Sequence, residues 1–97
     1  MAGIKLGFSL ADYAKFHNMG IGSAKLNDGS SLEILQDVNK NIIELYRVKA
    51  GKLLSAQEYG GPNAVSYAAK RISGLEHLEA EKGGIEKAWT QSLNYLA

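Results

Sequence analysis

The first stretch of residues that could do chemistry is Gly20-Ile21-Gly22-Ser23-Ala24-Lys25. Glycines leave backbone N–H groups accessible, and together with a lysine such a loop can cradle a phosphate. A dinucleotide-binding fingerprint, however, needs a third glycine where Lys25 stands, and a P-loop ends in Gly-Lys-Ser/Thr, which this segment lacks. We therefore interpret the segment as a flexible connection and expect no nucleotide cofactor.

The two histidines are the next candidates. His77 and Glu81 have the i,i+4 spacing of neighbouring side chains on a helix, but two ligands are only half of a metal site. The Glu-x-x-His pair of di-iron bundles is absent, because Gly74 stands three residues before His77. His17 has no carboxylate four residues further on. We expect no metal site.

Catalytic nucleophiles are equally hard to find. The chain has no cysteine, which excludes thiol nucleophiles, disulfides and thiolate zinc sites. None of its serines lies in a Gly-x-Ser-x-Gly elbow. The sequence therefore predicts a protein that is not an enzyme and that needs no cofactor.

Length and composition set the remaining bounds. The chain has 97 residues, of which 45% are hydrophobic and 22% charged, so we expect one small domain over residues 1–97. Eleven Lys and Arg against ten Asp and Glu give a net charge of +1, too little for phosphate-dominated binding of nucleic acid. No apolar run approaches the roughly 18 residues of a transmembrane helix, and the N-terminus lacks the core of a signal peptide. We expect a location in the cytoplasm, or export without a cleaved signal.

Turn signals divide the chain into segments that read as helices. They predict an all-α fold, either a small bundle of three to four helices or a helical hairpin, with an extended N-terminal arm. Alternation at Ile4, Leu6 and Phe8 predicts the arm, and the spacing of Ser9 and Asp12 predicts a helix cap. The predicted elements are an arm at 1–8 and helices at about 10–19, 31–50, 64–82 and 85–96, with 51–59 either continuing the second helix or forming a short one.

The predicted helix at 31–50 is the strongest. Its apolar residues would spread over roughly 220° of the helix surface, whereas a surface helix needs a stripe of roughly 100°. We therefore expect it to pack on two sides, within a bundle or against another chain. Asn39 falls inside the apolar arc, where it is either a tolerated polar residue at the rim or a buried amide that fixes register. The alanine-rich face of the helix at 64–82, which Asn63 would cap, predicts close pairing with this long helix.

These features favour a non-catalytic module for protein–protein interaction or assembly, either a homo-oligomer or filament subunit or a small partner of a larger protein. We also expect a charge-based contact between copies of the chain, which would join a basic cluster to an acidic one. The basic cluster is Arg47, Lys49 and Lys52, and the acidic cluster is Glu76, Glu79 and Glu81. The residues that we expect to bind a partner are Ile4, Leu6, Phe8, Ile34, Asn39, Ile43, Tyr46, Trp89 and Tyr95.

Two alternatives remain open. The first is a monomeric bundle that neutralises a specific target such as a toxin, because the chain resembles bacteriocin immunity proteins in size and expected helical content. The second is a small secreted helical-hairpin export substrate. The chain resembles WXG100 proteins in length and in its central Gly60-Gly61-Pro62 break, although its tryptophan is followed by Thr90-Gln91 instead of the defining motif, and Pro62-Asn63 resembles the turn of type III needle subunits.

Overall fold

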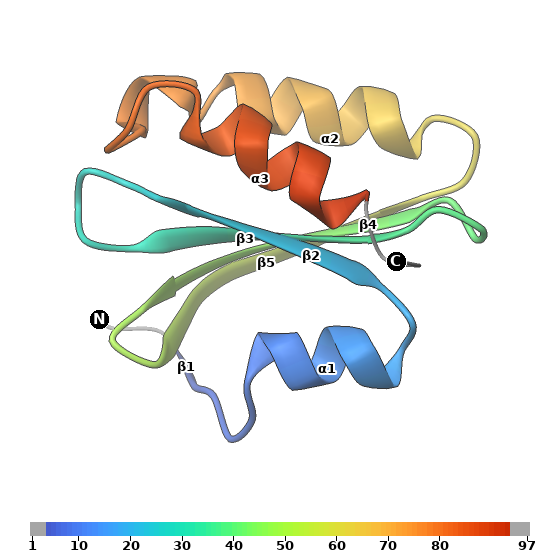
Figure 1. Ribbon diagram of the computed structural model, residues 1–97, viewed down its shortest axis with the longest axis horizontal. Coiled ribbons are helices and arrows are strands. Elements are labelled where there is room, and N and C mark those ends of the chain that lie inside the picture. Colours follow the sequence, from blue (N-terminus) through green and yellow to red (C-terminus); the bar gives the residue numbers. More distant parts are fainter. Residues whose placement is uncertain (1–3, 94–97) are drawn as a thin grey trace.

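The computed structural model describes residues 4–93, which form an antiparallel sheet with helices on both faces (Figure 1). The sheet has five strands in the order β1-β5-β4-β3-β2, and the first of them is only two residues long. Along the chain the elements are β1 (Ile4–Lys5), α1 (Leu10–Phe16), β2 (Gly20–Lys25), β3 (Ser31–Asp37), β4 (Ile42–Lys49), β5 (Lys52–Gly60), α2 (Ala64–Ser73), the 3-10 helix η1 (Glu76–Leu78) and α3 (Gly84–Ser92).

Two separate apolar clusters hold the layers together. The larger lies between the sheet and the helices α2 and α3, where Leu32, Ile34 and Ile43 meet Ile85 and other apolar residues. The smaller lies on the opposite face, beneath α1, and is formed by Ala14, Met19 and Leu35 with partly buried neighbours. Figure 1 shows α2 and α3 together on one face and the short α1 alone on the other. The α1 face of the sheet therefore has the thinner cover.

The predicted all-α fold is wrong, and the helix expected at 31–50 is the main error. This segment forms two antiparallel strands, β3 and β4, whose residues pair from Ser31 with Val48 to Asp37 with Ile42. Apolar residues would have covered a wide arc of a helix at 31–50 because the sheet buries both of its faces here. Consecutive residues such as Ile34 and Leu35 are therefore both fully buried. Asn39 lies exposed in the connecting turn, neither at a helix rim nor in a buried register pair.

The next segment, 51–59, is also a strand and not a helix. β5 follows β4 through a tight turn in which Ala50 and Gly51 both have positive φ angles of 51° and 76°. Two consecutive positive φ angles are typical of the hairpin turn whose twist matches that of the flanking strands. Gly51, which begins the segment expected to be helical, is thus part of a hairpin turn.

The segment expected to be a flexible glycine loop is strand β2, at the edge of the sheet. Its Gly22 lies against the backbone of Ala88 in α3, so close that a Cβ atom at Gly22 would be 1.8 Å from the Ala88 carbonyl oxygen. Glycine is needed here because two backbones touch. This contact excludes the phosphate-loop interpretation, since these backbone groups serve the sheet and the contact with α3.

The remaining helices are present but shorter than predicted. Ser9 caps α1 as its spacing predicted, because its hydroxyl accepts a hydrogen bond of 3.1 Å from the Asp12 N–H, yet α1 ends at Phe16 instead of residue 19. The segment expected as one helix at 64–82 divides into α2 and η1, and Asn63 makes no side-chain cap. α3 ends at Ser92, and residues 94–97 lie outside the described part.

The alanine face of α2 does not pair with a long helix. Ala64 and Ala68 are buried against the sheet, so the small residues bring α2 close to β4 and β5. The N-terminal arm also packs on its own chain: Ile4 pairs with Leu53, and the Leu6 N–H donates to the Gly51 carbonyl at 3.0 Å. In residues 4–93 the helices are too short and too polar to cross a membrane.

Candidate functional site

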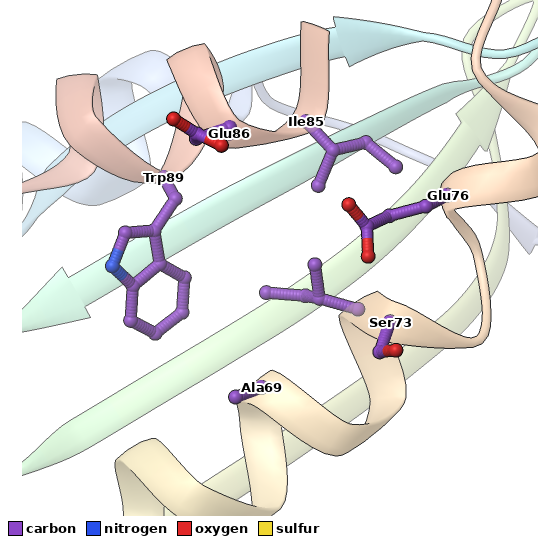
Figure 2. A pocket seen from close by; sticks show the side chains of 7 residues that line it. Ala69, Ser73, Glu76, Ile85, Glu86 and Trp89 are labelled. Carbon is purple, nitrogen blue, oxygen red and sulfur yellow. The ribbon is translucent and has the colours of Figure 1, made fainter. Parts of the chain in front are cut away.

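A depression with a volume of about 230 Å³ lies between α2 and α3. Figure 2 shows Ala69 and Ser73 on one side and Ile85 and Trp89 on the other, with the Glu76 carboxylate directed into the space between the helices. Its lining residues come from α2, η1 and α3, and they are Ala69, Ile72, Ser73, Glu76, Ile85, Glu86 and Trp89.

Contacts beneath α3 fix the position of this depression. Ser92 is fully buried and its hydroxyl accepts a hydrogen bond of 2.8 Å from the Gln36 side-chain amide, while it donates to the Trp89 carbonyl at 2.6 Å. At the other end, a Glu79 carboxylate oxygen accepts a 2.7 Å hydrogen bond from the Ile85 N–H in the first turn of α3. Both ends of α3 are therefore tied to the rest of the fold, and the close contact at Gly22 holds its middle.

The depression combines an apolar floor with negative charge. Its ionisable lining residues, Glu76 and Glu86, are both acids, and within residues 4–93 neither of them forms an ion pair. Ile72 and Ile85 are buried, whereas Trp89 is only half-buried. A ligand that fits here needs apolar groups for the floor and a positive group for the rim.

A second depression of about 220 Å³ continues from Trp89 toward the other end of α3. Trp89 lines both depressions, so its ring separates two parts of one groove, which we call the α2/α3 groove. The second part is bordered by three exposed apolar side chains, Val38, Val65 and Leu93. Large apolar side chains gathered at an open groove are typical of an interaction surface.

A polar cluster occupies the opposite face of the sheet. Glu44 is buried, and its two carboxylate oxygens accept hydrogen bonds from the hydroxyls of Tyr46 and, at 3.5 Å, Tyr13. Burial, together with the hydrogen bond to Glu44, raises the pKa of Tyr46 well above its ordinary value, and burial with the Glu44 charge raises the pKa of Tyr13. Both hydroxyls therefore stay protonated at neutral pH, and the cluster attaches α1 to the sheet.

The structure separates the residues expected to bind a partner. Ile34 and Ile43 are core residues with 0% and 2% exposure, so they offer a partner almost no surface. Leu6 and Phe8 lie in the arm on the α1 face, and Tyr46 is engaged by Glu44. The side chain of Ile4 and all of Tyr95 lie outside the described residues, and Asn39 is in the exposed β3–β4 turn. Of this set, Trp89 and the almost fully buried Ile43 line the α2/α3 groove, and Trp89 alone lines both of its parts.

The basic cluster is divided in the structure. Arg47 pairs with Asp28 at 2.7 Å, whereas Lys49 and Lys52 are exposed beside the β4–β5 turn. The hydroxyl and backbone N–H of Ser30, followed by the charge of Arg47, lower the pKa of Asp28. One of the three residues of the predicted basic cluster is therefore already used within the chain.

The acidic cluster has a different role from the one expected. Because the helix at 64–82 ends early, Glu79 precedes α3 instead of closing a long helix, and its carboxylate satisfies the N–H of the first turn of α3. Negative charge is favourable at that end of a helix. Glu76 lines the groove and Glu81 is exposed.

The sequence did not indicate the groove itself. Ile85 and Trp89 are four residues apart and lie on one apolar stripe of the last helix, but Ala69, Ser73 and Glu86 join them only because the sheet holds two helices side by side. The histidines do not contribute to it: His17 contacts the ring of Tyr13 at 4.4 Å between centroids, and His77 is exposed in η1. Within residues 4–93, no three His, Asp or Glu side chains gather as metal ligands.

Comparison of the chain with family models, curated proteins and solved structures gave no match. We therefore infer the function from the geometry of the α2/α3 groove.

Proposed function

We propose that this protein is a non-catalytic interaction module whose α2/α3 groove binds an amphipathic, basic helical segment of a partner protein. The single observation that carries the proposal is the apolar groove on either side of Trp89. Trp89 is half-buried at its centre, while Val65 and Leu93 at its end are 55% and 45% exposed. Tryptophan in a central, partly desolvated position is the residue type that most often dominates the energy of an interface.

The length of the groove supports a helical ligand. Ile85 and Leu93 lie at its two ends and are eight residues apart along α3 and its cap. At 1.5 Å per residue this separation is about 12 Å, close to the roughly 10.5 Å between residues i and i+7 of a bound helix. An amphipathic helix with apolar residues at i, i+3 or i+4, and i+7 would reach both depressions, which is a common mode of helix-in-groove recognition.

The charge of the groove supports a basic ligand. Glu76 and Glu86 border the depression nearest the start of α3 and are unpaired within residues 4–93. Complementary charge at a groove directs the orientation of the ligand and suppresses wrong partners. We therefore place the lysines or arginines of the bound helix at the Glu76 end and its last apolar side chain at the Leu93 end.

Trp89 gives a direct test because it is the single tryptophan of the chain. The full chain is titrated with an acetylated, amidated helical peptide of leucine, alanine and lysine that has leucines at i, i+4 and i+7 and lysines at one end. We expect a saturable change in Trp89 emission. The same peptide with glutamate in place of lysine should bind at least about tenfold more weakly, which corresponds to 1.4 kcal/mol.

Two matched variants on α2 locate the binding surface. Ala69 and Ser66 are both exposed on this helix, but only Ala69 lines the groove. Ala69→Arg should weaken peptide binding at least about tenfold, because it fills the depression and neutralises its rim, while Ser66→Arg should change it less than about twofold. Equal binding of the acidic peptide, or equal effects of the two variants, would contradict the proposal. Trp89 emission that depends on protein concentration without peptide would show instead that a second copy of the chain occupies the groove.

A further inference from the structure

A separate hollow of about 520 Å³ lies on the opposite face of the sheet, between the N-terminal arm and strands β2 to β4. The chain between β1 and α1 bends away from the sheet here, and α1 covers only part of this face (Figure 1). The residues around the hollow are mostly apolar or glycine: Leu6, Gly7, Phe8, Ser9, Leu10, Ala11, Ile21, Glu33, Val48 and Gly51.

Glu33 is the ionisable residue of this hollow. A neighbouring hollow of about 480 Å³ shares Ala11, Ile21 and Glu33 with it, so the carboxylate stands where the two spaces meet. A carboxylate beside apolar side chains is unfavourable unless something compensates it. Glu33 forms no ion pair within residues 4–93.

Two hydroxyl groups hold this carboxylate in place. Ser23 on β2 donates to Glu33 Oε2 at 2.8 Å, and Ser31 on β3 donates to the same oxygen at 2.7 Å. Neither hydroxyl donates to Oε1. One oxygen is therefore fixed by the protein. Within residues 4–93 no group donates to the other oxygen, which can accept a hydrogen bond from a bound group.

We propose that this hollow binds a small primary alkylammonium ion. Its ammonium group would donate to Glu33 Oε1, and its alkyl chain would lie on Leu6, Phe8, Ile21 and Val48. The volume of the hollow falls within the roughly 300–1,000 Å³ of small-molecule sites, and a few fixed polar groups on an apolar lining are typical of them. The negative charge selects a cation over a neutral or acidic molecule of the same shape. This site is independent of the α2/α3 groove and does not depend on the function proposed for that groove.

The test compares three ligands of similar size, hexylammonium, hexanol and hexanoate, by amide chemical shifts of the full ¹⁵N-labelled chain. We expect hexylammonium to give saturable shifts at Leu6, Ile21, Glu33 and Val48. Hexanol and hexanoate should bind at least about tenfold more weakly, because hexanol brings only a neutral donor to the Glu33 carboxylate and hexanoate brings a like charge. Equal binding of hexanol, shifts confined to other parts of the chain, or no saturable shift would overturn the proposal.

Two carboxylate variants distinguish the effect of the Glu33 charge on binding from the effect of other negative charge on this face of the sheet. Glu58 is exposed on β5 and lies on the same face of the sheet, through its pairing with Glu44, but it does not line the hollow. Glu33→Gln should weaken hexylammonium binding at least about tenfold and Glu58→Gln less than about twofold. Equal effects would refute the role of Glu33.

A third variant covers the case in which Glu33→Gln fails to fold. Ala11 is exposed on α1 and lines both hollows, so Ala11→Lys places a competing ammonium group beside Glu33 without disturbing the core. It should abolish the shifts caused by hexylammonium. Unchanged binding to Ala11→Lys would also overturn the proposal.

Discussion

Replacing Gly22 by alanine should strongly destabilise the fold, because α3 and β2 touch at this residue through their backbones. An added Cβ would lie 1.8 Å from the Ala88 carbonyl oxygen and 2.9 Å from its Cα, and real Cβ contacts essentially never fall below 3.0 Å. α3 must therefore withdraw from 1.8 to at least 3.0 Å, a shift of about 1.2 Å. No side-chain rotation can relieve a clash with a carbonyl group.

The size of the effect follows from what α3 would lose. Overpacking of a core costs about 1–3 kcal/mol, and a rigid backbone neighbour places Gly22→Ala at the upper end of that range. The shift would also strain the hydrogen bond between Gln36 and Ser92, whose loss costs about another 1 kcal/mol. We expect a loss of about 3 kcal/mol or more in the free energy of unfolding, which lowers Tm by about 12–24 °C in a domain of this size.

Thermal unfolding followed by circular dichroism measures this loss, with Gly60→Ala as the matched control. Gly60 ends strand β5, and an added Cβ there would meet no atom within 4 Å, so its replacement should change the stability by less than about 0.5 kcal/mol. If Gly22→Ala melts at the same temperature as Gly60→Ala, the contact between β2 and α3 is not as described and the position of the groove is wrong.

Three further perturbations test the interior and the charges. Ser92→Ala should cost about 1–3 kcal/mol in chemical denaturation because it leaves the buried Gln36 amide without its partner, and a combined change of both residues to apolar ones should cost less than the sum of the separate changes. The folded-state pKa of Tyr46 is raised, so its contribution to stability is complete below pH about 10 and declines as the pH rises further; Tyr46→Phe should flatten this alkaline decline in urea denaturation. Ser30→Ala should raise the pKa of Asp28 toward its ordinary value, as followed by carboxyl carbon NMR during acid titration, and an unchanged pKa would contradict the hydrogen-bond explanation.

The starts of the helices could be predicted from the sequence because they depend on neighbouring residues. Ser9 and Asp12 form the start of α1 through a contact three residues apart, and Gly83 precedes α3 with a positive φ of 78°. α2 begins directly after Asn63, where the chain leaves the Gly60-Gly61-Pro62 break. Such local signals do not depend on what the element packs against.

β3 and the first half of β4 could not be recognised as strands, because both faces of the sheet are buried there. β3 carries apolar residues on the helical face at Leu32 and Ile34 and on the α1 face at Leu35, which removes the alternation that identifies a half-buried strand. Continuous apolar runs of this kind fit a buried helix equally well. Two features mark the strands better. Ile42 and Ile43 are β-branched residues at the start of β4, after the turn at Asn39, and Ala50 and Gly51 have the positive φ angles of the turn that ends it.

The candidate sites were predictable only where a single helix carries them. Trp89 stood out as the single tryptophan on an amphipathic stripe, and it is central to the α2/α3 groove. Glu33 gave no signal, because its partners Ser23 and Ser31 approach it only through the pairing of β2 with β3. A site that several strands assemble can be predicted only if the pairing register of those strands is known, and local sequence patterns do not give that register.

The most direct test of the central claim, that the α2/α3 groove binds a basic amphipathic helix, is to map the same leucine–lysine peptide on the ¹⁵N-labelled chain. We predict saturable shifts of the Trp89 indole N–H and of the amides of Ala69, Ile85 and Glu86, with the α1 face unaffected. Shifts confined to the α1 face or to β5, with the Trp89 indole unchanged, would contradict the account.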